Sequence, residues 1–480
     1  MTETDSRHSR IERLATELNC TLDDAVRAEI LSYAAELQTV VDERAEPATV
    51  VTESAGHRSD DDHNALLWVY DEPRREQDSG PLGGLSFAIK DNIAVRGLAM
   101  TCGLTEFEYV PSFDAVVVER LLDAGASLVG KANMDAFAVG PAGQWSELGT
   151  VTNPNYEGRV PGGSSSGSGA AVAAGFVDAA LGTDTGGSVR SPAACCGIVG
   201  VKPTHGLVPR TGFVDLLPST DTIGPLTRDV DTARMTLEAI AGPDPRDPTA
   251  AHVDRTRVFE TPSHITIGVV TGPMDEADTE IAKTIERVLD RTEAATDVTV
   301  TTVELAFEEI NAAFSLALGA EFAWLVKQGF VTRGQGTQYN AEWAAALAAV
   351  TFNEHIASRV LTGALLDAET DGRSYVVARR EAIAFRERLT RLFETVDVIL
   401  TPTLRSVPPK PGEILTAAEG LQYSNTKPFS LAAGPAVSVP VGHTDGLPVS
   451  AQVVAPPFHD GVALECAKRI EGSRNDKPTN

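Results

Sequence analysis

The sequence predicts an α/β protein in which helices cover a largely buried β-sheet. From about residue 65 onward, short apolar runs alternate with segments that have helical periodicity. This alternation is typical of strands that are buried between helices. The chain has 480 residues, of which 42% are apolar, and this composition supplies enough side chains for a large core.

The first 64 residues are expected to form a helical segment and a linker ahead of a main domain at 65–480. Residues 9–44 have the pattern of two helices, and Thr21 with Asp24 predicts the start of the second. The polar stretch at 45–64 is expected to be a loop. The second helix has an apolar face that we expect to pack on the main domain, formed by Val26, Ile30, Tyr33, Leu37 and Val41.

The main domain shows a series of apolar runs and periodic segments. Strands are expected at 85–89, 127–130, 265–270, 298–303, 396–400, 436–439 and 449–454. Helices are expected at 115–124, 170–176, 280–291, 375–393 and 461–471.

The charge balance and the cysteines limit the class of protein. The net charge is −27, and no basic patch of the kind that binds nucleic acid is present. Acids outnumber bases by 67 to 40 and most of the bases are arginine, which favours a cytoplasm with very high salt; an ordinary acidic protein is the alternative. The five scattered cysteines, the polar N-terminus and the lack of a long apolar stretch predict a cytoplasmic protein without disulfides.

A run of glycine and serine at 162–169 is followed at once by an Ala/Val-rich helical run at 170–176. Alone, the first run has the composition of a flexible linker. A loop that opens directly into a helix, however, presents N–H groups and hydroxyls at the positive end of the helix dipole. The Gly-Lys-Ser/Thr element of a nucleotide-binding loop is absent, so the segment is expected to bind an anionic or hydroxyl-rich group other than a nucleotide.

A second glycine-rich segment runs from Gly182 to Arg190 and contains Gly186-Gly187-Ser188. Two glycines ahead of a serine allow a sharp turn that points several N–H groups at one spot. An oxyanion hole needs such donors beside the nucleophile that generates the charge. A tight structural turn has the same composition, so the spacing alone leaves both interpretations open.

Two lysines at the ends of apolar runs are candidates for a general base. Lys90 ends the run that starts at Leu85, and Lys202 follows the run from Ile198 to Val201. A lysine that emerges from a buried strand loses solvation, so its pKa falls toward neutrality and the neutral amine can serve a serine nucleophile. The alternative for either residue is a lysine that pairs with a carboxylate.

Together these segments resemble the amidase signature family. The resemblance is carried by the block from Pro161 to Ser168 and by the block from Gly182 to Arg190. Ser188 lies 24 residues after Ser164, as the family's nucleophilic serine follows its bridging serine. Ile89-Lys90-Asp91-Asn92 matches the family's lysine motif, which selects Lys90 over Lys202. The resemblance covers about residues 65–472, with further matching blocks at 130–135, 202–206, 221–226, 434–440 and 446–449.

The resemblance implies the family's fold, a central mixed β-sheet with helices on both faces. It also implies an amidase that hydrolyses carboxamides and uses neither metal nor cofactor. Lys90, as a neutral amine, would take a proton from Ser164, which relays one from Ser188. Ser188 would attack the amide carbonyl and form an acyl-enzyme, which water then hydrolyses.

The resemblance assigns further residues around this relay. The oxyanion would be held by the backbone N–H groups of Thr185, Gly186, Gly187 and Ser188. The peptide bond between Gly163 and Ser164 would be cis. Supporting hydrogen bonds are expected from Ser165, Ser166, Asp184 and Arg190.

A rival interpretation uses Ser165. Residues 163–167 also fit the nucleophile elbow of the α/β-hydrolases, which would make the protein an esterase. That elbow should follow a buried strand, but residues 153–160 are polar and rich in turn formers. It also needs a downstream acid and histidine, and no histidine has a distinctive setting. We therefore favour the amidase over this alternative and over a non-enzymatic scaffold.

Two subclasses of the family differ in their partners. The glutaminase subunits of tRNA-dependent amidotransferases carry an Arg-Phe-Asp-Gly-type segment and an acidic substrate contact. This chain lacks the segment and has Tyr423 at the position of the acid. Residues 202–209 resemble instead the free-standing amidases, including those of nitrile pathways. The expectation is a small-molecule amide substrate, no nucleic acid, no membrane and a possible homodimer; the alternative is a glutaminase subunit.

The charge predicts that stability depends on salt. We expect the Tm to rise steadily between about 0.1 M and about 1 M KCl, because the Debye length falls from about 10 Å to about 3 Å over this range. Repulsion among the carboxylates of a chain with net charge −27 is then screened. Thermal unfolding followed by circular dichroism at a series of KCl concentrations measures this. A flat Tm would show that the acidity is incidental.

Overall fold

The computed structural model describes residues 3–17, 20, 23–44, 54–330, 352–413 and 423–474. These fall into two units, Met1–Thr49 and Val50–Asn480. The smaller unit contains α1 (Glu3–Glu17) and α2 (Asp24–Arg44), which are joined by an ion pair of 2.7 Å between Arg27 and Glu12.

The start of α2 is capped by a residue that the sequence did not indicate. The carboxylate of Asp23 accepts the N–H of Val26 at 2.8 Å, whereas Thr21 lies outside the described residues. Four residues of the predicted apolar face, Val26, Ile30, Tyr33 and Leu37, are exposed. The packing of this face on the main domain stays a prediction.

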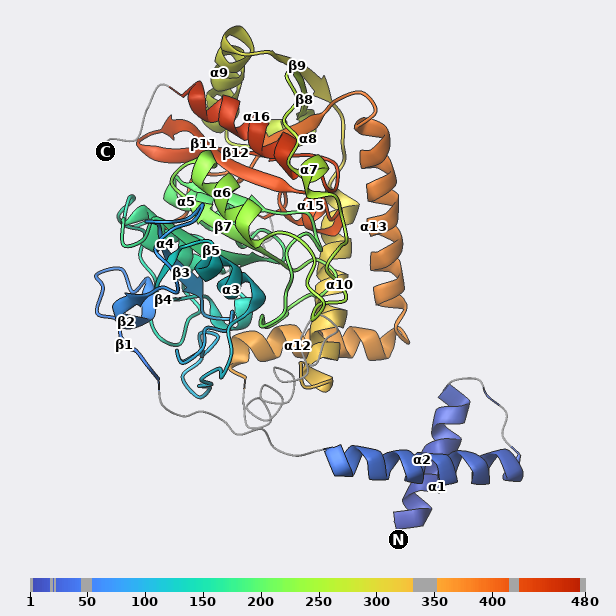
Figure 1. Ribbon diagram of the computed structural model, residues 1–480. Coiled ribbons are helices and arrows are strands. Elements are labelled where there is room, and N and C mark those ends of the chain that lie inside the picture. The colour runs from blue at the N-terminus through green and yellow to red at the C-terminus, as the bar shows by residue number, and fades with distance from the viewer. Residues whose placement is uncertain are drawn as a thin grey trace. The chain divides into compact units, whose positions relative to one another are not determined.

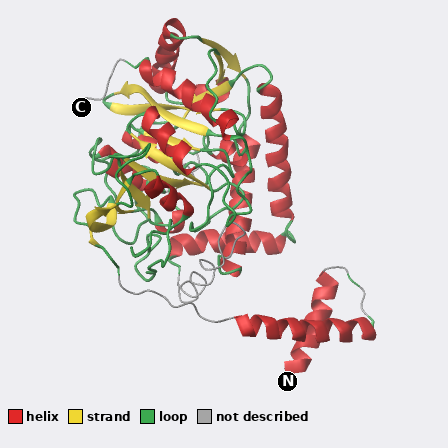
Figure 2. Cartoon of the chain, viewed as in Figure 1, coloured by secondary structure: helices red, strands yellow, loops and turns green. Residues whose placement is uncertain are grey.

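The strands of the larger unit form one mixed sheet of twelve strands (Figures 1 and 2). Their order is β1-β2-β4-β3-β5-β7-β6-β11-β12-β10-β8-β9. β3 runs parallel to β4 and β5, and β8 runs parallel to β9 and β10, while the other neighbours are antiparallel. The strands are β1 (His57–Arg58), β2 (Leu66–Arg74), β3 (Ser86–Lys90), β4 (Ser127–Ala132), β5 (Ala179–Asp184), β6 (Val199–Lys202), β7 (Thr222–Thr227), β8 (Ile265–Val270), β9 (Val298–Val303), β10 (Val398–Pro402), β11 (Ala436–Thr444) and β12 (Leu447–Val454).

Helices cover both faces of this sheet, which confirms the predicted fold class. α3, α6, α9 and α16 pack on one face, and α4 and α5 pack on the other. The helices are α3 (Val116–Asp123), α4 (Ser166–Ala173), α5 (Arg190–Cys196), α6 (Val230–Ile240), α7 (Arg255–Val258), α8 (Thr271–Asp275), α9 (Thr279–Ala295), α10 (Glu308–Lys327), α12 (Glu354–Glu369), α13 (Arg373–Leu392), α15 (Lys427–Leu431) and α16 (Asp460–Gly472), with a short 3₁₀ turn η1 (Ala136–Ala138).

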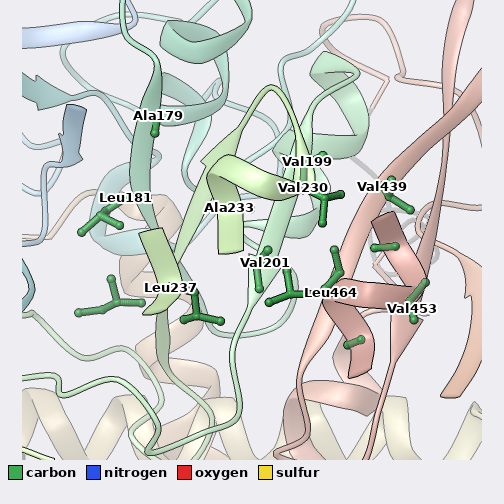
Figure 3. Packing of buried hydrophobic residues seen from close by; sticks show 14 of the residues in the cluster. Ala179, Leu181, Val199, Val201, Val230, Ala233, Leu237, Val439, Val453 and Leu464 are labelled. Carbon is green, nitrogen blue, oxygen red and sulfur yellow. The ribbon is translucent and has the colours of Figure 1, made fainter. Parts of the chain in front are cut away.

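The main core lies between the sheet and the helices of the first face. Figure 3 shows Leu181 of β5, Val201 of β6 and Leu237 of α6 in this cluster, and all three are fully buried. Alternate residues of β5 face opposite sides, because Leu181 joins this cluster and Ala180 joins the cluster under α4. Complete burial of a Leu or Val side chain stabilises the fold by about 1.5–3 kcal/mol.

The predicted elements of the larger unit are present within a few residues of their expected bounds. Several further elements were not predicted, among them β2, β5, β6, β7, α6, α10 and α12. The short strands β5, β6 and β7 contain glycine, threonine or proline and are buried on both faces, so they lack the alternation that marks a half-exposed strand. β1 also interrupts the stretch that was expected to be a loop.

One helical segment was missed as an apolar stretch. By length and composition alone, Glu309–Lys327 is long and apolar enough to cross a membrane, and 44% of it is buried inside the fold. α10 packs against α12 and lies beside α13 (Figure 1), so contacts within the protein account for its apolar composition.

A close approach of two helices predicts a stability effect. Where α10 meets α12, a Cβ atom at Gly363 would lie 2.0 Å from the carbonyl oxygen of Gly319. We expect Gly363→Ala to destabilise the protein by about 1–3 kcal/mol through overpacking, although alanine favours helix. Urea unfolding in molar KCl measures this. Gly472→Ala in α16 is the matched control, because no atom lies within 4 Å of that added Cβ. Equal stability of Gly363→Ala and wild type would contradict the close packing.

Candidate active site

Strand β3 delivers Lys90 to the start of α4. Ile89 faces the main core and Ala88 faces the cluster under α4, so the alternation of the strand directs Lys90 to the α4 side. Lys90 is fully buried. Its Nζ donates two hydrogen bonds of 2.8 Å, one to Ser164 Oγ and one to Thr183 Oγ1. The predicted base and bridging serine are thus in direct contact.

The geometry separates the two lysines that the sequence left as candidates. Burial lowers the pKa of Lys90 to about 7, although the charge of Asp135 opposes the shift. Burial, assisted by the charge of Arg190, also lowers the pKa of Lys202 to about 7. Lys202 Nζ, however, donates to the carbonyl of Pro203 at 2.8 Å and contacts neither serine. Both amines lose charge near neutral pH, but only Lys90 is placed to act on a serine.

The serine segment ahead of α4 is wholly buried. The peptide bond between Gly163 and Ser164 is cis, as the family resemblance implied. Ser165 Oγ accepts the N–H of Thr183 at 3.2 Å and donates to the carbonyl of Thr183 at 3.2 Å. Ser165 is thus engaged with backbone, so the structure does not support the elbow nucleophile of the esterase alternative. The hydroxyl of Ser166 is buried and has no hydrogen-bond partner.

Ser188 lies on the glycine loop between β5 and α5 and is partly exposed. Its carbonyl accepts the N–H of Ser165 at 3.3 Å, but its hydroxyl makes no hydrogen bond with Ser164. In the described part of the chain, no acceptor binds the backbone N–H groups of Thr185, Gly186, Gly187 and Ser188. These four donors are therefore available for an oxyanion.

An ion pair holds the far side of the glycine loop. The guanidinium of Arg190 donates to the carboxylate of Asp184 at 2.8 and 3.0 Å, and Asp184 also accepts the N–H of Val189 at 3.2 Å. Burial alone would raise the pKa of Asp184, but Arg190 holds it below its ordinary value. Arg190 also donates to the carbonyl of Thr426 at 2.9 Å, which connects the loop to the C-terminal part of the chain.

Two aspartates in the matching blocks have contacts that the sequence did not reveal. Asp135 accepts N–H groups of the loop at 142–145 over 2.9–3.2 Å, and burial raises its pKa to about 6. Asp221 accepts the hydroxyl of Thr185 at 2.6 Å, and burial, with the nearby charge of Asp215, raises its pKa to about 7. Both residues support loops that border the site.

A cavity of about 460 Å³ opens beside Ser188, within the range of about 300–1,000 Å³ that is typical of small-ligand sites. One wall is formed by the glycine loop, and the opposite wall by α10 and α12, including Phe314 and Arg359. Tyr423 and Lys427 complete it, and the hydroxyl of Tyr423 donates to the carbonyl of Pro141. Within the described ranges no cluster of His, Cys, Asp and Glu is placed to hold a metal ion. Metal-free chemistry stays a prediction.

Comparison with known proteins identifies the family. A family model described as Amidase matches residues 43–464, so this chain belongs to the amidase family. A subunit of glutamyl-tRNA(Gln) amidotransferase from Haloarcula marismortui is 41% identical over 409 residues, which cover 82% of this chain and 96% of that protein. The crystal structure of the subunit of the same name from Thermotoga maritima has a TM-score of 0.74 at 34% identity and covers 86% of this chain and 88% of that one. A crystal structure described as an amidase has a TM-score of 0.70 at 30% identity and covers 86% of this chain and 92% of that one.

These similarities correct the expected partners. The prediction of a small-molecule amide substrate, no nucleic acid, no membrane and a possible homodimer was wrong, because similar proteins are named as one component of a tRNA amidotransferase. The prediction relied on the net charge of −27 and on the motifs. The charge of one chain does not describe an assembly, in which another subunit can supply the basic surface.

The setting of Lys90 predicts a rising pH dependence. We expect kcat/KM for amide hydrolysis to increase with pH through about 7, because only the neutral amine accepts a proton and the pKa of Lys90 is about 7. Initial rates of ammonia release from about pH 5 to about pH 9 measure this. Lys202→Met should keep the rising limb, since Lys202 contacts no serine. A limb that persists in Lys90→Met and vanishes in Lys202→Met would reverse the assignment.

Proposed function

We propose that this chain is the ammonia-producing subunit of an amidotransferase of the glutamyl-tRNA(Gln) kind and hydrolyses glutamine through an acyl-enzyme on Ser188. The hydrogen bond of 2.8 Å from the buried Lys90 amine to Ser164, beside the cavity onto which Ser188 opens, carries this proposal. The 41% identity to a protein that bears the name of such a subunit supports the assignment to an amidotransferase. Residues 65–480 form the catalytic domain in this proposal, and the enzyme acts in the cytoplasm.

Acylation begins with the neutral amine of Lys90. Lys90 Nζ takes the proton of Ser164 Oγ as Ser164 takes the proton of Ser188 Oγ. Ser188 Oγ bonds to the carbonyl carbon of the amide, and the oxygen becomes negative. The free N–H groups from Thr185 to Ser188 stabilise this oxyanion. The Ser188 hydroxyl must turn toward Ser164 for the relay, and such contacts often form only with substrate bound.

Release of ammonia uses the same relay in reverse. The carbon–nitrogen bond breaks, and the proton on Lys90 returns through Ser164 to the departing nitrogen, which leaves as ammonia. Water then attacks the ester and loses a proton along the same route, and the proton finally returns to Ser188 as the carboxylic acid is released. The ion pair of Asp184 and Arg190 fixes the loop that carries Ser188 throughout these steps.

Substitution of the relay residues tests the chemistry. Ser188→Ala should abolish ammonia release from glutamine, and Ser164→Ala and Lys90→Met should each reduce kcat by about 10³-fold or more, with losses that are not additive, because the three groups act as a unit. An ammonia assay in molar KCl measures the rates, and the Tm of each variant confirms folding. Labelling by a fluorophosphonate should disappear in Ser188→Ala and persist in Ser165→Ala.

Two results would contradict parts of the proposal. Near wild-type turnover in Lys90→Met would remove the lysine from the relay. Release of ammonia from other carboxamides but not from glutamine would remove glutamine as the donor. The assignment to an amidotransferase fails separately if the active chain, combined with the other subunits of such an enzyme, does not convert glutamyl-tRNA(Gln) to glutaminyl-tRNA(Gln).

A further inference from the structure

Lys427 is the first residue of α15 and lines the same cavity as Ser188. Its N–H donates to the carbonyl of Tyr423 at 3.1 Å. The hydroxyl of its neighbour Thr426 donates to the carbonyl of Gly186 at 2.6 Å. The backbone of Lys427 is therefore held beside the glycine loop, while its long side chain borders the space that a substrate would occupy.

The ammonium group of Lys427 lacks a counter-ion. Its Nζ lies 5.7 Å from the centroid of the Phe314 ring, and among the described residues it makes no hydrogen bond or ion pair. Burial, followed by the positive charge of Arg359, lowers its pKa to about 8, so most of the charge remains at neutral pH. A partly buried cation that faces another cation costs free energy, and a bound anion would remove that cost.

The charged groups that face this cavity have one sign. The described lining residues include Lys427 and Arg359 but no Asp or Glu. The nearby acids are engaged elsewhere: Asp135 accepts backbone N–H groups, and Asp221 accepts the hydroxyl of Thr185. An anionic group on the substrate is therefore the ligand that this part of the cavity favours.

We infer that Lys427 binds a carboxylate of the substrate and so selects amides that carry a carboxylate over neutral amides. The inference rests on the proposed function, because glutamine carries such a group, and it adds the residue that recognises this end of the molecule. The contact lies inside the cavity, where salt screens charges less than at the surface, so it can operate in molar KCl.

A matched pair of substrates tests the inference. Glutaramate and pentanamide have the same chain length and amide, and differ in a terminal carboxylate against a methyl group. We expect Lys427→Met to lower the ratio of kcat/KM for glutaramate to that for pentanamide at least tenfold, mainly through the KM for glutaramate. Lys427→Arg should restore most of the ratio. Lys283→Met, an exposed lysine on α9, is the control and should keep the wild-type ratio.

A binding measurement separates this inference from the proposed function. Calorimetry with glutarate should show at least tenfold weaker binding to Lys427→Met than to wild type at one fixed KCl concentration, and it needs no turnover. A glutarate affinity that is equal in both proteins, or an equal loss of kcat/KM for both amides, would overturn the role of Lys427. Persistent hydrolysis in Ser188→Ala would overturn the proposed mechanism and leave the glutarate result intact.

Discussion

The burial of the Lys90 amine is the constraint on which the arrangement of the site depends. A lysine in water is charged at neutral pH and cannot accept a proton, so a lysine base must lose its solvation. Lys90 loses it at the end of β3, which lies in the sheet between β4 and β5. Two hydroxyls replace the water, those of Ser164 and Thr183. The start of α4 and the end of β5 must therefore meet the end of β3.

A second constraint fixes the glycine loop from behind. Arg190 joins Asp184 to three groups from the C-terminal part of the chain, the carbonyl of Thr426, the hydroxyl of Ser430 and the amide of Gln452. All of these groups are buried, and removal of one partner from such a network leaves an uncompensated charge that costs about 3–5 kcal/mol. The position of the oxyanion donors thus depends on strands and helices that lie far apart in the sequence.

Chemistry and recognition come from different parts of the fold. The relay and the oxyanion donors lie between residues 90 and 188, while the opposite wall of the cavity comes from α10, α12 and α15. Changes in those helices can alter the substrate without disturbing the relay. This separation is consistent with similarity to structures whose names differ, an amidase and one component of a tRNA amidotransferase.

The sequence by itself determined the fold class, the bounds of β8 and β9, and the three residues of the relay. Those strands are continuous β-branched runs, and local composition is enough to find them. The tertiary structure alone decided which of two equally buried lysines touches a serine, since Lys90 and Lys202 have the same lowered pKa. It also decided the contacts of Asp135 and Asp221 and the place of Lys427. These depend on segments brought together by the sheet order, and no local pattern records them.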